Sequence, residues 1–219
     1  MKHLSILLII TFFTFNSFAQ IDRFTFGLKF SPSISWLKSS TKGLDSEGSK
    51  LGFSYGIMTD FNFTDNYSFA TGLDITYRGG VLSTVLNDSL YRGTTTYRLQ
   101  YIEIPLTLKM RTNEIGYFTY FGQFGLVPGI NIRAKGDVEF SPTIAGFPNK
   151  ATEDDIDLKD EINVPTLSLL IALGTEYSLA GDTRLMIAFA FNNGFIDVLD
   201  NKSLKATSSY FALNLGVFF

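Results

Sequence analysis

Strict two-residue alternation of side chains constrains this chain more than any other feature, and its last eleven residues, Ser209 to Phe219, show it most clearly. Successive side chains of an extended strand point to opposite faces of a sheet. Every second residue here is apolar, and together these residues form one face. That face consists of Phe211, Leu213, Leu215, Val217 and Phe219. The stretch therefore predicts a β-strand with one wholly apolar side.

The same alternation recurs earlier in the chain. It appears in segments 24–36, 51–63, 69–78, 101–111, 117–133, 167–177 and 185–191. Long polar connections at 38–50, 79–96, 134–163 and 192–206 alternate with short turns at 64–66, 112–116 and 180–182. This order predicts an all-β fold, an eight-stranded antiparallel up-and-down transmembrane β-barrel in which the last strand pairs with the first.

Three details of this barrel stay open. A ten-stranded barrel is the alternative, with 136–145 contributing part of an extra hairpin. Residues 81–86 can extend a hairpin above the membrane. Pro105 interrupts the segment 101–111 and removes one ladder hydrogen bond, so we expect a local bulge there.

The charges indicate which face is wet. Roughly forty large apolar side chains lie on the apolar face of the predicted strands. The interior of an eight-stranded barrel is only just wide enough to be filled by side chains, so they cannot all point inward. The charged residues within the strands lie on the opposite, polar face, and a charge that faces lipid is energetically costly. We expect a lumen charge network, structural or gating, and an apolar exterior. Its residues are Lys29, Asp60, Asp74, Arg78, Glu103, Lys109, Arg111, Arg133, Glu176 and Arg184.

Residues 1–19 read as a signal peptide. A polar start with Lys2 and His3 precedes an apolar run to Phe15, and Ser17 and Ala19 supply small residues before the expected cleavage at Gln20. A retained anchor is the alternative, although the apolar run is short for a spanning helix. The outer-membrane β-barrel domain is then 20–219.

The segment Y-I-E-I-P-L-T-L-K at 101–109 resembles a motif of the PorT-like outer-membrane β-barrel proteins of Bacteroidetes. The segments 122–128, 174–177 and 192–195 fit the same family, and the aromatic C-terminus resembles the C-terminal targeting strand of bacterial outer-membrane barrels. The resemblance implies the bacterial outer membrane as location, with lipid around the barrel and the barrel-assembly machinery as partner during insertion. It also implies association with envelope or secretion-complex proteins.

The composition excludes several kinds of chemistry. The chain has no Cys, and its one His, His3, lies in the signal peptide. Hydrolase mechanisms that use His are therefore closed, and the net charge of −3 gives no basic footprint for nucleic acid. We expect no enzyme activity and no cofactor. An acidic segment offers a candidate cation site, but its spacing does not match an EF-hand loop, and a solvated segment is the simpler interpretation. Its residues are Asp154, Asp155, Asp157, Asp160 and Glu161.

The sequence thus favours a non-enzymatic scaffold or interaction module in the outer membrane, with both termini in the periplasm and long extracellular loops. The alternative is a narrow transport or gating barrel that uses the charged lumen. Aromatic residues near the predicted strand ends, such as Trp36, Tyr77, Phe63 and Phe219, indicate two interfacial girdles.

Overall fold

The computed structural model describes residues 24–86, 91–142, 151–179, 181–201 and 203–219. The predicted signal peptide, 1–19, lies outside the described residues. The described residues are built almost wholly of strands, and among them lies one short 3₁₀ helix, η2 (Lys159–Glu161). The strands are β1 (Phe24–Ser39), β2 (Leu44–Asn62), β3 (Tyr67–Leu86), β4 (Tyr91–Glu103), β5 (Leu106–Arg111), β6 (Phe118–Pro142), β7 (Ala151–Asp157), β8 (Pro165–Ser178), β9 (Arg184–Asp197) and β10 (Ala206–Phe218). Within the described ranges, no helix is both long enough and apolar enough to cross a membrane.

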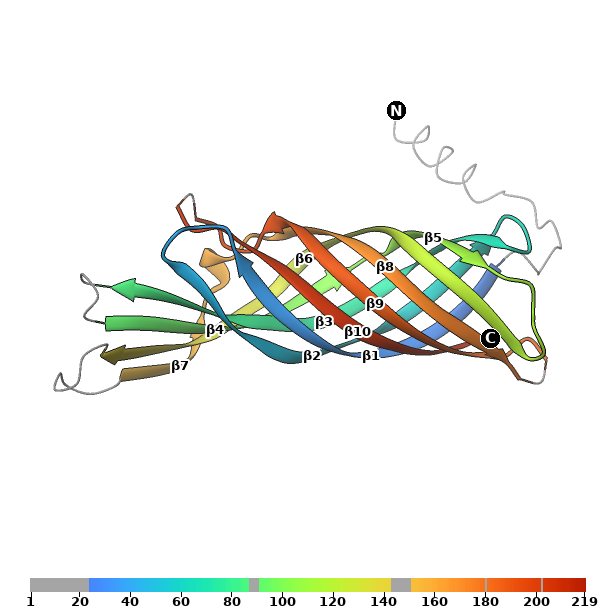
Figure 1. Ribbon diagram of the computed structural model, residues 1–219, viewed down its shortest axis with the longest axis horizontal. Coiled ribbons are helices and arrows are strands. Elements are labelled where there is room, and N and C mark those ends of the chain that lie inside the picture. The colour runs from blue at the N-terminus through green and yellow to red at the C-terminus, as the bar shows by residue number, and fades with distance from the viewer. Residues whose placement is uncertain (1–23, 87–90, 143–150, 180, 202) are drawn as a thin grey trace, which may run out of the picture.

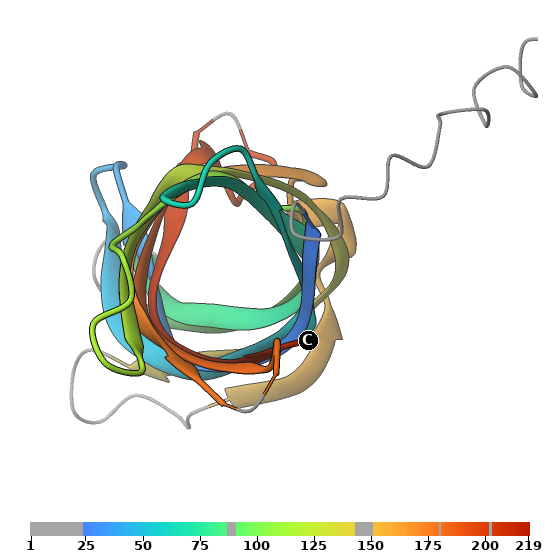
Figure 2. The same cartoon turned by 90° about the vertical axis from the view of Figure 1, so that its right-hand side faces the viewer.

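The strands close into a ring, and the described residues form an eight-stranded antiparallel barrel (Figures 1 and 2). Neighbouring strands of the ring pair in chain order, except that β6 pairs directly with β8, because β7 lies off the ring and pairs with β6. The last strand, β10, closes the ring by pairing with β1, as in Leu215 opposite Phe30. The ring counts β4 and β5 as one strand, because they are consecutive pieces between β3 and β6. The eight-stranded prediction is confirmed.

The ten-stranded alternative is wrong. Residues 136–142 continue β6 and pair on one side with β4 and on the other with β7. The β6–β7 hairpin and the β3–β4 hairpin extend beyond the ring at the end opposite the short turns (Figure 1). We call these two hairpins the extension.

Pro105 interrupts a strand without changing its register. Glu103 pairs with Asp74 and Leu106 with Thr71, so the two pairs are three positions apart on both strands. The pairing with β6 is continuous in the same way, and Ile104 still donates to the carbonyl of Pro128 at 2.9 Å. The expected bulge at Pro105 is therefore absent. A bulge lies earlier in the strand pair, where β6 carries an extra residue opposite Gln100 and Tyr101.

The two faces of the barrel differ as the alternation predicts. Large apolar side chains cover the exterior and are exposed, and they include Phe30, Ile57, Phe124, Phe189 and Phe211. Aromatic pairs gather near both ends of the barrel. Phe24 contacts Phe61 at the short-turn end, with ring centroids 5.2 Å apart. At the other end Trp36 lies 5.5 Å from Phe211, and Phe53 stacks on Tyr77 at 4.6 Å.

Candidate functional site

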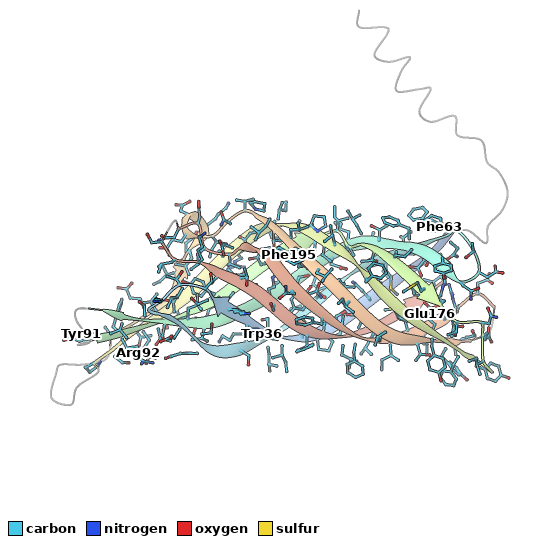
Figure 3. The ribbon with its side chains drawn as sticks, turned by 45° about the horizontal axis from the view of Figure 1, so that its top comes forward. Trp36, Phe63, Tyr91, Arg92, Glu176 and Phe195 are labelled. Atoms are coloured by element: carbon cyan, nitrogen blue, oxygen red, sulfur yellow. The ribbon has the colours of Figure 1, made fainter. Side chains whose placement is uncertain are left out.

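The interior of the barrel holds the candidate site, and its first part is a cluster around Lys109 near the short-turn end. The Lys109 ammonium lies 2.8 Å from Asp60 Oδ2 and also contacts Glu176. Arg184 reaches the other oxygen of Glu176 at 2.8 Å. The Lys109 side chain is 1 % exposed, so these charges are paired away from bulk water. Figure 3 shows Glu176 toward the short-turn end. We call this group the Lys109 cluster.

Aromatic rings enclose the Lys109 cluster. The ammonium lies 4.5 Å from the centre of the Phe121 ring and 4.7 Å from that of Phe218. Both rings are buried together with Met58 and Met186. A cation held over ring faces gains electrostatic stabilisation that compensates part of its lost hydration. The inward-facing Phe218 therefore supports the charge network, while its neighbour Phe219 points outward and is exposed.

A second cluster surrounds Arg78 further along the barrel. Arg78 Nη1 lies 2.8 Å from Glu103 Oε1, and its guanidinium stacks 4.1 Å above the Tyr101 ring. Glu103 Oε2 accepts hydrogen bonds from Thr76 at 2.8 Å and from the Tyr210 hydroxyl at 3.3 Å. This carboxylate is thus held by three donors or cations from β3 and β10. We call this group the Arg78 cluster.

A third ion pair passes over a glycine. Lys29 on β1 lies 2.8 Å from Asp74 on β3, although β2 runs between these strands. The β2 residue that pairs with both Lys29 and Asp74 is Gly56. A methyl group at Gly56 would lie 2.4 Å from Asp74 Oδ1. The absence of a side chain at Gly56 therefore opens the path for this bridge.

Apolar side chains close the barrel at the end that carries the extension. Leu158 and Ile162 from the β7–β8 connection pack with Val198 and Leu199 from the β9–β10 connection against inward-facing residues of the strands, such as Leu82. The two connections are linked through their backbones: Asn163 N donates to Val198 O at 2.8 Å, and Asp200 N to Glu161 O at 2.8 Å. We call this group the apolar plug. Its full set is Leu37, Leu44, Leu82, Tyr97, Leu99, Tyr101, Ala134, Leu158, Ile162, Val198, Leu199 and Ala206.

Little space is left between the charge clusters. A hollow of about 30 Å³ borders Lys29, Asp60, Lys109 and Asn214. A hollow of this size has room for only one or a few water molecules. Side chains thus fill this part of the interior, as expected for eight strands.

Nine of the ten charges predicted for the lumen lie inside the barrel. They are Lys29, Asp60, Asp74, Arg78, Glu103, Lys109, Arg111, Arg184 and Glu176. The prediction is wrong for Arg133, which is exposed and pairs with Gln100 on the exterior. The physical reason is the bulge opposite Tyr101, where β6 carries one extra residue between Asn131 and Arg133. One extra residue reverses which side of the sheet the following side chains face.

The five acids of the predicted cation site do not come together. Among the described residues no group of three or more His, Cys, Asp or Glu side chains is placed to hold a metal ion. Asp155 contacts Lys135 and Arg98 instead, and Asp157 accepts a hydrogen bond from the backbone N–H of Lys159 at 3.0 Å. The acidic segment is therefore organised by basic side chains and backbone donors.

Ion pairing also shapes the extension. The pKa of Asp155 is lowered, chiefly by the hydrogen bond from Lys135, with Arg98 adding to the effect. The pKa of Asp137 is lowered by the backbone N–H of Asp155 and then by Arg98. Asp155 has a φ of 58°, an uncommon backbone conformation that lies within an irregularity of the β6–β7 pairing. The two carboxylates therefore link β4, β6 and β7.

Sequence reasoning missed four members of the interior clusters. Tyr101 and Tyr210 lie on the same, inward face of their strands as neighbouring polar residues. Their position in the two-residue alternation could have identified them. Thr76 lies on the same face of its strand as Asp74 and Arg78. Gly56 carries no local signal, because its role depends on which residues of β1 and β3 it faces.

The closed ring, the apolar exterior and the paired interior charges define a transmembrane β-barrel of the bacterial outer-membrane kind. The chain belongs to the outer membrane protein beta-barrel domain family, whose model matches residues 18–200. No curated protein sequence matches the chain.

Solved structures of outer-membrane proteins resemble the fold. Neisserial surface protein A is 15% identical, with a TM-score of 0.48 over 88% of this chain and 95% of that one. Ail of Yersinia pestis is 15% identical, with a TM-score of 0.32 over 90% and 97%. OprG of Pseudomonas aeruginosa is 11% identical, with a TM-score of 0.36 over 89% and 94%. At these identities the likeness concerns the fold alone.

Proposed function

We propose that this protein is a non-enzymatic outer-membrane scaffold: a barrel closed to solutes that holds the extension outside the cell as an interaction surface. The observation that carries the proposal is the combination of the apolar plug at one end with the paired charges inside the barrel. A permeation path would have to disrupt both. The extension, in contrast, presents exposed polar side chains on β7 such as Glu153 and Asp154.

The proposed orientation places both ends of the barrel domain in the periplasm. The start of β1, the end of β10 and the short turns lie at one end of the barrel, and the extension lies at the other (Figure 1). Outer-membrane barrels have short periplasmic turns and longer extracellular loops. Accessibility of an engineered cysteine at exposed Glu153 to a membrane-impermeant reagent on intact cells tests this orientation; labelling only after the envelope is broken contradicts it.

The non-enzymatic part rests on the state of the interior acids. General acid–base catalysis needs a carboxyl group that can exchange a proton with a substrate. Glu103 and Glu176 each bind cations inside the barrel, and Asp60 and Asp74 are each bound to a Lys. These carboxylates are engaged as ion-pair partners.

Conductance of the purified protein in a planar bilayer tests closure. We expect traces equal to those of the bare bilayer, with a porin in the same apparatus as the positive control. Discrete channels that disappear when Glu103 or Arg111 is neutralised would favour the narrow transport barrel instead. A variant with Leu158→Ser and Val198→Ser weakens the apolar plug and is the matched control for leakage.

The resemblance of 101–109 to PorT-like proteins supports a narrower role in an envelope complex concerned with protein secretion. Its test is affinity purification in mild detergent from the native membrane. Replacing residues 139–152 by an Asn-Gly turn shortens the β6–β7 hairpin while leaving the ring intact. We expect envelope proteins to copurify with the full chain and to be lost with the shortened hairpin. Equal recovery with both chains contradicts the extension as the interaction surface.

A further inference from the structure

A cluster of bases borders a hollow in the barrel wall beside the aromatic girdle. Arg98 on β4 pairs directly with Lys135 on β6. Arg133 lies on the same strand as Lys135, two positions earlier. Lys50 on β2, which pairs with the inward-facing Ser35, lines the same hollow. The hollow has a volume of about 380 Å³ and is also bordered by the interior residues Arg78 and Leu99. We call Lys50, Arg98, Arg133 and Lys135 the basic cluster. Like charges on paired strands repel one another, so their convergence needs an explanation.

The hollow forms where two strands separate. The pairing of β2 with β3 is interrupted between Gly48 and Phe53. In this gap the Ser35 hydroxyl hydrogen-bonds the backbone of Gly79. It donates to the Gly79 carbonyl at 2.8 Å and accepts from the Gly79 N–H at 2.9 Å. Gly79 itself has no side chain and pairs with Arg98. The sheet is therefore held open beneath the bases by specific hydrogen bonds.

The charges of the hollow do not balance. Asp155 contacts both Arg98 and Lys135, and Asp137 contacts Arg98. Arg133 and Lys50 form no ion pair with a described residue, although Lys50 lies near enough to Asp137 to help lower the pKa of that carboxyl group. Arg133 is exposed. Two of the four bases thus remain available to an anion. Arginine in particular favours phosphate, because its planar fork can donate two parallel hydrogen bonds.

The position of the basic cluster indicates the source of the anion. Tyr77, stacked on Phe53, pairs with Gln100, and its hydroxyl oxygen accepts a 3.0 Å hydrogen bond from Gln100 Nε2. These rings belong to the girdle that marks the membrane interface. Gly79 and Arg98 lie two residues beyond Tyr77 and Gln100, a rise of about 7 Å along a strand. Leu51, which is 86 % exposed, borders the same hollow from the lipid-facing side.

We propose that the basic cluster binds the phosphorylated head group of an outer-leaflet lipid, with Arg133 and Lys50 on the phosphate and with Leu51 and Tyr77 against the start of an acyl chain. The site holds an amphiphile because its charged and apolar walls meet at the interface. This inference rests on the outer-membrane placement of the proposed function, but it requires neither a closed lumen nor a protein partner.

The test measures lipid retention by native mass spectrometry on the full barrel in detergent. The probes are monophosphoryl lipid A, the same glycolipid after removal of its phosphate, and inorganic phosphate. We expect the phosphorylated lipid to bind about tenfold more tightly than the dephosphorylated one, the usual worth of a hydrogen bond to a charged group. Equal binding of the two glycolipids overturns the proposal.

Variants locate the site. We expect Arg133→Gln and Lys50→Gln each to abolish most of the preference for phosphate. Arg92→Gln, toward the tip of the extension, removes a partly exposed base that pairs with Glu47 and should change nothing (Figure 3). A similar loss in Arg92→Gln, or none in the Arg133→Gln and Lys50→Gln double variant, overturns the assignment. Heat-modifiable migration on gels confirms that each variant is folded.

Inorganic phosphate separates a lipid site from a general anion site. We expect it not to displace the glycolipid at matched concentration, because it makes no contact with Leu51 or Tyr77. Displacement at matched concentration assigns the cluster to free anions and overturns the lipid. Bilayer conductance is measured separately, so an open lumen with intact lipid retention would overturn the scaffold and leave the lipid site standing.

Discussion

The ammonium of Lys109 lies 2.8 Å from the carboxylate of Asp60 inside the barrel. Lys109 belongs to β5 and Asp60 to β2, and these two strands are not adjacent in the ring. The same ammonium contacts Glu176 on β8. One side chain therefore connects three separate strands across the lumen. Burying a charge is unfavourable unless it is paired, so the three residues depend on one another.

Lys109→Met should destabilise the barrel by about 3–5 kcal/mol, because it leaves two buried carboxylates without their shared cation. Urea unfolding in lipid vesicles, followed by tryptophan fluorescence, measures the change. Lys109→Arg keeps the charge and is the control. An unfolding midpoint for Lys109→Met equal to that of the native chain contradicts the interpretation of this cluster as stabilising.

Gly56→Ala should weaken the bridge between Lys29 and Asp74. The new methyl group would lie 2.4 Å from Asp74 Oδ1 and 2.2 Å from the Leu73 carbonyl, so the strands must shift. We expect a loss of about 1–3 kcal/mol, as is typical of overpacking. The same unfolding assay measures it, with Ser54→Ala on the same strand as the control. The bridge is not the cause of the loss if Gly56→Ala is equally damaging in a chain that already carries Lys29→Met and Asp74→Asn.

The β6–β7 hairpin should loosen in acid. The pKa values of Asp137 and Asp155 are lowered in the folded protein, so their contribution is complete above the unfolded-state pKa and is lost as the pH falls through the folded values. The transition should therefore begin below about pH 4. Asp155 is exposed and Asp137 is partly exposed, so the effect should be small and confined to the hairpin.

Hydrogen exchange of the β7 amides, compared with those of β9 at each pH, measures this loosening. The variant Arg98→Gln with Lys135→Gln removes the cations that lower both pKa values, and it should be loose already at neutral pH. If the exchange rates of the β7 amides change in parallel with those of β9 at every pH, the ion pairs of Asp137 and Asp155 do not stabilise the hairpin locally.

Trp36 should report the depth of the girdle. It is the single Trp of the chain and lies within contact of Phe191 and Phe211 on the exterior. We expect lipids brominated near the head group to quench its fluorescence more strongly than lipids brominated near the chain end. Trp36→Phe gives the background signal. Stronger quenching from the bilayer centre would show that the girdle is misplaced.

The sequence by itself determined the strands of the ring and which side of nearly every one is apolar, because alternation is a local property of an extended chain. It assigned the strands of the extension, within 79–96 and 134–157, to polar connections. From it followed the closed ring, with Phe211 and Leu215 on the outside of the last strand. Nine of the ten charges expected inside could be placed by parity alone.

The tertiary structure decided what parity could not. Arg133 lies outside because of a bulge that depends on the pairing of β4 with β6, and Gly56 matters only because Lys29 and Asp74 lie on either side of it. The apolar plug joins two connections far apart in sequence. Register between strands, and the packing of loops across a ring, depend on contacts between distant residues, and no pattern within one strand records those contacts.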